Sequence, residues 1–249
     1  MCAVGEAGPL LAAPVCRRLP APPGVRCVGL RLDEVARGVP DDGPPTPAFA
    51  ALLSDEELCR FAQLRLRKRR IEWLAGRIAA KQALRHMPVA LRHPRQATVR
   101  QAADGRPAFE GYALSISHSR REAFAAVSAR AVGVDTETFD AMRAESLSAL
   151  IRPDEAHALA RDLGCDLQAA RTVAWCLKEA LFKAAGGGAF VPFACALQLD
   201  GWPAGDISPA WHWHGESARH LPALDAWRVG FGLERDAAWA IVAALIRGP

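Results

Sequence analysis

The stretch LQAARTVAWCLKEALFKAAGGG, residues 167–188, decides how the second half of this protein folds. Its apolar residues recur three and four positions apart, a spacing that places them on one face of an α-helix. The three glycines that follow are typical of a helix C-terminus. The stretch therefore predicts a long helix over 167–185 with a single buried face. The residues expected on that face are Val173, Cys176, Leu177, Ala180, Leu181 and Ala184.

One edge of this helix carries polar residues. Trp175, Glu179 and Lys183 lie four residues apart in turn, so they should line one edge. A Glu followed by a Lys four positions later is a common surface ion pair, worth about 0.3–0.5 kcal/mol. The set therefore indicates a functional site only if other motifs support it.

Two further acids stand at the end of the apolar run Val132–Val134. Asp135 and Glu137 are two residues apart, and in a strand this period directs both carboxylates to the same side. Neighbouring carboxylates repel each other unless a cation or a proton lies between them. Taken alone, the pair is an exposed strand end; with Glu179 it becomes a candidate metal site.

Two helices are expected in the first half. Ser54 and Glu57 form a capping box, which predicts a helix that begins there and runs towards Leu64. A second apolar stripe predicts a helix over 69–85. Its opposite face is expected to present a column of cations, which suits either a solvated surface or a phosphate site. These cations are Arg70, Arg77, Lys81 and Arg85.

Strands are expected around these helices. Those of the central region should form one mainly antiparallel sheet, and the last third should supply three more. The expected ranges are 25–32, 97–101, 113–117, 123–129, 131–136, 195–199, 226–232 and 238–245. Helices followed by strands occur once in each half, although no repeat has a fixed period. We therefore expect an α+β fold divided into 1–129, with the basic helix and a Ser-His-Ser turn, and 130–249, with the carboxylates.

His118 directly follows the strand expected over 113–117 and lies between Ser117 and Ser119. A lone histidine is usually structural. In a serine-rich turn after a strand, however, imidazole and backbone N–H groups can meet a phosphate.

Bulk properties exclude several classes of protein. The chain has 249 residues, 51% of them hydrophobic, and a net charge of +4, which suits a globular protein with an anionic partner. No apolar stretch approaches the roughly 18 residues that a membrane-spanning helix needs, so we expect a cytoplasmic protein. The seven cysteines are scattered without a C-x-x-C pair, which predicts reduced thiols and neither disulfides nor a zinc site.

Together, these motifs propose an enzyme that acts on a polyphosphate ester. Three carboxylates suit a hard cation such as Mg²⁺, which keeps open positions for substrate phosphates. The histidine and the cationic helix face would hold the remaining phosphate charge.

The order of five motifs resembles that of the Sfp-type 4'-phosphopantetheinyl transferases, over roughly residues 54–200. The motifs are Gly76-Arg77-x3-Lys81, Gly105-Arg106-Pro107, Ser117-His118-Ser119, Gly133-Val134-Asp135-Thr136-Glu137 and Trp175-x2-Lys178-Glu179-Ala180-x2-Lys183. This resemblance implies two similar α/β subdomains, related by a pseudo-twofold axis, that enclose coenzyme A between them.

The resemblance also implies roles for single residues. Asp135, Glu137 and Glu179 would hold Mg²⁺, and Glu179, Lys183 and His118 would be catalytic. Contacts to coenzyme A are expected from Arg77, Lys81, Arg106, Pro107, Ser117, His118, Lys178 and Lys183. Arg65, Arg67 and Arg70 are further candidates for its 3'-phosphate.

The reaction implied is transfer of phosphopantetheine from coenzyme A to a serine of an apo acyl or peptidyl carrier protein, with release of 3',5'-ADP. Such carriers serve fatty-acid, polyketide and nonribosomal peptide synthesis. The expected protein is a monomer, with neither nucleic acid nor a membrane as partner. Two alternatives stay open at this point: a magnesium-dependent phosphohydrolase, and a non-catalytic module that binds coenzyme A or a carrier protein.

Overall fold

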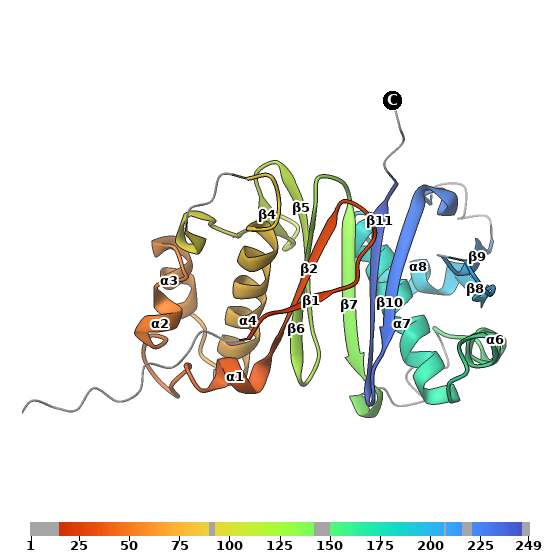
Figure 1. The fold of residues 1–249 in the computed structure, drawn as a ribbon, viewed down its shortest axis with the longest axis horizontal. Helices are drawn as coiled ribbons and strands as arrows, with labels where there is room; N and C mark the ends of the chain where they lie inside the picture. Colours follow the sequence, from red (N-terminus) through yellow and green to blue (C-terminus); the bar gives the residue numbers. More distant parts are fainter. Residues whose placement is uncertain (1–14, 90–92, 142–149, 207, 216–220, 246–249) are drawn as a thin grey trace, which may run out of the picture.

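The computed structural model describes residues 15–89, 93–141, 150–206, 208–215 and 221–245. Two β-sheets stand side by side in the middle of the molecule, and helices cover the outer face of each (Figure 1). This arrangement confirms the α+β class that the sequence predicts. Within the described ranges, no helix is both long enough and apolar enough to cross a membrane.

The first sheet has six antiparallel strands and is built from the first half of the chain. In spatial order these are β1 (Arg17–Leu19), β2 (Val25–Arg31), β6 (Glu122–Ser128), β5 (Tyr112–His118), β4 (Pro107–Phe109) and β3 (Arg100–Gln101). Its helices are α1 (Leu32–Ala36), α2 (Pro47–Ala50), α3 (Asp55–Ala62) and α4 (Arg67–Leu84). The apolar face of α4 packs on β2 and β6 and forms the core of this half.

The second sheet has three strands and lies in the second half. Its order is β10 (Trp227–Leu233), β11 (Ala237–Ala244) and β7 (Val132–Thr138). A separate pair consists of β8 (Leu197–Gly201) and β9 (Ala210–Trp213). The helices are α6 (Pro153–Leu163), α7 (Leu167–Ala184) and α8 (Phe190–Ala196). All six residues expected on the inner face of α7 are buried.

The local signals for the helix expected to begin at Ser54 are confirmed, and this helix is α3. Ser54 Oγ accepts a hydrogen bond from the Glu57 amide at 3.3 Å, and Glu57 Oε2 accepts one from the Ser54 amide at 2.9 Å. The helix α3 begins at the next residue, as a capping box requires.

The prediction of one central sheet is wrong for β7. That strand pairs with β11, in the second sheet. The reason is that β6 already has β2 on one side and β5 on the other, so no hydrogen-bonding edge of β6 is left for β7. The chain therefore crosses from one half to the other between Ser128 and Val132.

One expected strand is shorter than predicted, and another begins and ends two residues later. Within 97–101 only Arg100 and Gln101 are in a strand, and Cys195 lies in α8, so β8 begins at Leu197.

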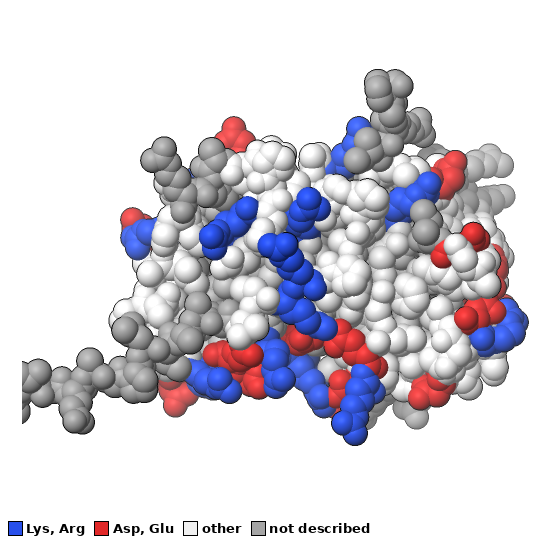
Figure 2. All heavy atoms as spheres, in the orientation of Figure 1, with Lys and Arg blue, Asp and Glu red and all other residues white. Residues whose placement is uncertain are grey.

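The expected cation column on α4 is also corrected. Arg70 and Lys81 are buried: Arg70 donates hydrogen bonds to the carbonyl oxygens of Pro40, Asp41 and Gly43, and Lys81 binds Glu57. Lys and Arg instead form a band down the middle of one face, over the region of β1 and β2, with mixed charges below it (Figure 2).

A buried ion pair joins α3 to α4 in the first half. Lys81 Nζ contacts the carboxylate of Glu57, and both side chains are at most 2% exposed. The ammonium also donates to Leu52 O at 2.9 Å and Pro94 O at 3.1 Å. Glu57 Oε1 accepts from the Val99 amide at 3.1 Å. The pair therefore ties two helices and two loops together.

The second half contains the same arrangement. Lys178 Nζ lies 2.9 Å from Glu155 Oε1, and both side chains are again at most 2% exposed. The ammonium donates to Leu150 O at 2.8 Å and Ala194 O at 3.0 Å. Glu155 Oε1 accepts from the Leu199 amide at 2.8 Å.

Each partner in one half has a counterpart in the other, so the two halves repeat this arrangement although the sequence shows no repeat of fixed period. We call these pairs the two Glu–Lys clamps. We propose that the boundary between subdomains lies at 129/130, in the connection between β6 and β7.

The helix α7 and the strand β7 are in close backbone contact at Gly133. A Cβ atom at this position would overlap the carbonyl oxygen of Ala180, a backbone atom that moves only if the helix moves. Glycine is therefore required here for close packing.

We predict that Glu57→Gln and Glu155→Gln each lower the free energy of unfolding by about 3–5 kcal/mol, because each leaves a buried ammonium without its counter-charge. Urea unfolding measures the loss. Glu56→Gln is the control: this exposed acid on α3 pairs with Arg100 at 3.3 Å, and its loss should change stability by less than about 0.5 kcal/mol. Losses below about 1 kcal/mol in both clamp variants would contradict the assignment.

We also predict that Gly133→Ala lowers the free energy of unfolding by about 1–3 kcal/mol, because the added methyl group overpacks the contact between α7 and β7. Thermal unfolding, compared with the exposed neighbour variant Ala131→Ser, checks this. Equal stability of the two variants would show that the helix can move away from the strand freely.

Candidate active site

Three elements from both halves of the chain meet at one cluster of polar side chains. The strand β7 contributes Asp135 and Glu137, β5 contributes Ser117 and His118 from its end, and α7 contributes Glu179 and Lys183. The period of two along β7 places both acids on one side, as predicted, while Thr136 Oγ1 turns away to donate to Ala238 O at 3.3 Å.

Asp135 is the centre of the cluster and is 5% exposed. Its Oδ1 accepts hydrogen bonds from Ser117 Oγ and from Lys183 Nζ, each at 2.7 Å. The Lys183 ammonium also donates to Val134 O at 3.3 Å. The middle of β7, the end of β5 and the helix α7 are thereby joined at one carboxylate.

Glu179 and Glu137 flank this centre. Glu179 Oε2 lies 3.5 Å from Lys183 Nζ. Glu137 Oε1 accepts from the amide of Thr138 at 2.8 Å, so its carboxylate turns towards its own strand. Burial raises the pKa of both glutamates, and the negative charge of Asp135 adds to the rise.

The charges around Lys183 have the opposite effect on its ammonium. Burial opposes the charged form, but Asp135 and Glu179 outweigh burial and raise the pKa of Lys183. Lys183 is therefore a fixed positive charge at neutral pH.

The residues present fit a divalent cation, although they do not form a closed cage. In the described parts of the chain, no three His, Cys, Asp or Glu side chains are already grouped so that they could hold a metal. Lys183 lies beside both Asp135 and Glu179, and Glu137 is turned aside. Asp135 Oδ2, however, is buried without a hydrogen-bond partner among the described residues. An orphaned carboxylate oxygen between two further acids is a donor that a cation would satisfy.

A cationic pocket of about 460 Å³ opens beside the cluster. His118 joins the two, because it lines this pocket and directly follows Ser117. Burial lowers the pKa of His118, and the charges of Arg69, Lys183 and Lys68 lower it further, although the nearby Glu72 opposes the fall. The net shift favours the neutral imidazole at pH 7. The residues around the pocket include Arg60, Arg69, Glu72, Trp73, Arg77, Gln101, Gly105 and Pro107.

Arg77 stands out within this pocket. Its guanidinium lies 4.9 Å from the centre of the Trp73 ring, and its Nε is buried without a partner among the described residues. Burial lowers its pKa, and the charge of Arg60 lowers it further, although arginine remains charged. A cation held in this way against an aromatic ring suits a phosphate group.

Two predicted contacts lie elsewhere, and a third lies at the edge of the pocket. Lys81 and Lys178 are buried in the two Glu–Lys clamps, and this corrects the expectation that they face a phosphate. Arg106 is half-exposed, and its Nε donates to Asp104 Oδ2 at 2.7 Å. It lies at the rim of the pocket, next to the pocket residues Gly105 and Pro107.

The sequence interpretation missed Arg60 and Arg69. It offered Arg65, Arg67 and Arg70 instead. Arg67 and Arg70 bind backbone carbonyls between Ala36 and Gly43, and Arg65 is exposed and is not among the residues that line the pocket. Arg60 is the last cation of α3, one turn beyond Glu57, and its position in the helix is the only sequence signal that could have pointed to it.

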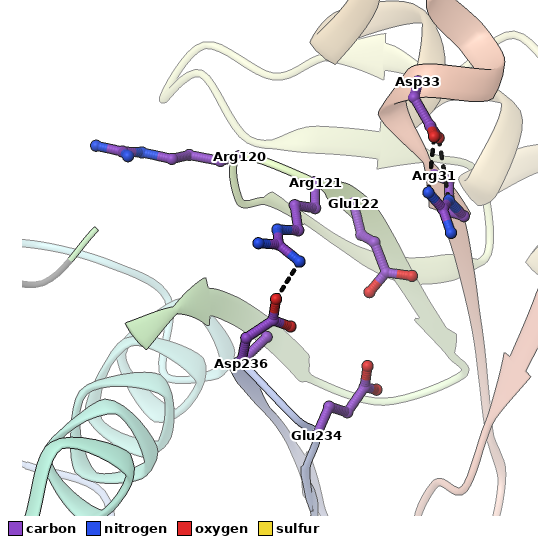
Figure 3. A pocket seen from close by; sticks show the side chains of 8 residues that line it. Arg31, Asp33, Arg120, Arg121, Glu122, Glu234 and Asp236 are labelled. Atoms are coloured by element: carbon purple, nitrogen blue, oxygen red, sulfur yellow. Dashed lines mark hydrogen bonds and ion pairs between the residues drawn. The ribbon is translucent and has the colours of Figure 1, made fainter. Parts of the chain in front are cut away.

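A second hollow, of about 410 Å³, lies beyond the turn that follows His118 (Figure 3). Charged residues from both halves line it. Arg121 pairs with Asp236, and the two glutamates of the lining, Glu122 and Glu234, lie 2.9 Å and 2.6 Å from Arg17 of β1. We therefore regard this hollow as a seam that fastens the two halves together.

Two family models match the chain. Residues 131–241 match that of the 4'-phosphopantetheinyl transferase superfamily, and residues 59–128 match that of the 4'-phosphopantetheinyl transferase N-terminal domain. Two relatives, each named enterobactin synthase component D, come from Escherichia coli O157:H7 and Shigella flexneri. Each is 41% identical over 130 residues, an alignment that covers 51% of this chain and 61% of the relative.

The chain therefore belongs to the 4'-phosphopantetheinyl transferase superfamily. The alignment covers only about three fifths of the length of these relatives, and family membership alone does not assign their activity to this chain.

Proposed function

We propose that this protein transfers the 4'-phosphopantetheine arm of coenzyme A to a serine hydroxyl of an apo carrier protein. The observation that carries the proposal is the junction at His118, where a cationic pocket meets a cluster of three acids and a lysine. Coenzyme A has the matching chemistry, because a nucleotide with a 3'-phosphate is joined to the arm through a pyrophosphate.

The pocket would hold the nucleotide end of coenzyme A. Arg77 and Arg60 supply charge for its phosphates, Trp73 supplies a ring face, and Arg106 stands at the rim. Ser117 and His118 then lie between this end and the acids, next to the pyrophosphate.

Asp135, Glu137 and Glu179 would hold Mg²⁺, whose charge, when bound, offsets that of the pyrophosphate. The transfer itself forms a bond between the serine oxygen and the β-phosphorus and breaks the bond from that phosphorus to the oxygen of the leaving 3',5'-ADP. Lys183, which stays protonated, stabilises the charge that develops on the leaving group. Glu179 accepts the serine proton as the general base.

The partner would be a carrier domain of a biosynthetic synthase, since both relatives are named as synthase components. We further propose that the protein acts as a monomer in the cytoplasm, where coenzyme A and carrier proteins meet. The main alternative is a binding module that holds coenzyme A without turnover.

The decisive measurement is the intact mass of apo acyl and peptidyl carrier proteins after incubation with this protein, coenzyme A and Mg²⁺. We predict a gain of one phosphopantetheine on the carrier serine, which EDTA abolishes. Glu179→Gln should lower turnover by about 100-fold or more, the scale of general-base catalysis, while Glu110→Gln, at an exposed surface acid, should not. Coenzyme A binding without any transfer would favour the binding module.

A second prediction concerns the pocket. Arg77→Ala and Arg60→Ala should each weaken coenzyme A binding by roughly 10- to 100-fold in a calorimetric titration, because each removes a charged partner of a phosphate. Arg95→Ala, at an exposed arginine paired with Asp55, is the control and should bind normally. Unchanged affinity in both pocket variants would move the nucleotide site elsewhere.

A further inference from the structure

Two histidines meet on the β8–β9 pair, and neither belongs to the clusters described above. His212 lies in β9, and His214 follows that strand and is fastened by its amide to Ala196 O at 2.7 Å. The alternating residues Trp211 and Trp213 pack against the core of the second half. The period of two therefore leaves both imidazoles on the outer face, with their Nε2 atoms 2.9 Å apart.

A carboxylate orients one of these rings. His212 Nδ1 lies 2.6 Å from Asp200 Oδ2, so Nδ1 carries the proton and the lone pair of Nε2 is left for another partner. Metal-binding histidines characteristically have this second contact, in which the ring nitrogen away from the metal donates to a carboxylate.

The separation of the two nitrogens matches a pair of metal ligands. With metal–nitrogen bonds of about 2.0–2.1 Å, two nitrogens 2.9 Å apart subtend an angle of about 90° at the metal. That is the angle between neighbouring ligands in the square-planar or tetragonal sites of Cu²⁺ and Ni²⁺. A tetrahedral Zn²⁺ site would separate the nitrogens by about 3.3 Å.

The surroundings favour a cation. His214 Nε2 donates to Gln198 Oε1, so a bound metal would displace the proton on this nitrogen. Gln198 Oε1 also accepts from Arg152, while its amide nitrogen lies 3.3 Å from Asp200 Oδ1 and 3.4 Å from Asp154 Oδ2. The two carboxylates outweigh the single guanidinium, so the net charge around the imidazoles is negative.

We propose that His212 and His214 form a two-nitrogen site for a divalent metal that prefers imidazole, Cu²⁺ above all and Ni²⁺ next. Asp200 orients His212, and water completes the coordination. The site is separate from the carboxylates of the candidate active site, and it does not depend on the proposed function.

The test is a titration of chelator-treated, full-length protein with CuCl₂ and NiCl₂, followed by calorimetry and by tryptophan fluorescence. Trp211 and Trp213 flank the site, so bound Cu²⁺ should quench their emission. We expect a single Cu²⁺ per chain, retained in millimolar Mg²⁺, which would fill the oxygen site and leave imidazoles untouched. Binding that disappears in Mg²⁺ would place the metal at the carboxylates and overturn the proposal.

Variants separate the roles of the residues. His212→Gln and His214→Gln should each weaken Cu²⁺ binding by at least about 10-fold, and Asp200→Asn should weaken it by roughly 10-fold, as expected when the carboxylate that orients a ligand is lost. His157→Gln, at an exposed histidine on α6, is the matched control and should bind Cu²⁺ normally. Full-strength binding by both His212→Gln and His214→Gln would show that the two rings share only a hydrogen bond.

Electron paramagnetic resonance of the Cu²⁺-loaded wild-type protein identifies the ligand atoms directly and needs no variant to fold. We expect superhyperfine splitting from two imidazole nitrogens. A spectrum with oxygen donors alone would overturn the site.

Discussion

The helix α7 lies against β7 with no side chain between them at Gly133, where the strand meets the carbonyl of Ala180. This close approach brings Lys183 to Asp135 and sets Glu179 beside the same ammonium. Because α7 is itself held by the clamp between Lys178 and Glu155, the position of the charged cluster follows from buried contacts on the opposite side of the helix. The close packing of α7 on β7 thus fixes the positions of the side chains in the candidate active site.

Both halves anchor a long helix with a buried Glu–Lys clamp, but the two helices present different side chains to the candidate active site. Each clamp holds a long helix to the loops around it with one buried ammonium. The helix α4 presents Trp73 and Arg77 to a pocket, whereas α7 presents Glu179 and Lys183 to Asp135. One half thereby supplies mainly cations and the other mainly acids, and Ser117 links them by its hydrogen bond to Asp135.

Ion pairs between the two halves also fix their relative position. Arg17 from β1 bridges Glu122 and Glu234, and Arg121 pairs with Asp236 across the seam. These pairs lie just beyond the turn that follows His118, so the geometry at the junction depends on contacts from both sheets. A polyphosphate that spans the junction would meet residues from each half, which is why neither half contains the whole candidate site.

By itself, the sequence determined the features that depend on backbone periodicity. Alternation along a strand placed Asp135 and Glu137 on one side, helical spacing put Glu179 near Lys183, and a capping box began α3 at Asp55. Only the tertiary structure decided the fate of Lys81 and Lys178, the sheet that β7 joins, and the meeting of Arg60 with Arg77. The physical reason is that a charged side chain is buried or exposed according to its partner, and for both clamp lysines that partner comes from another helix, more than 20 residues away in the chain.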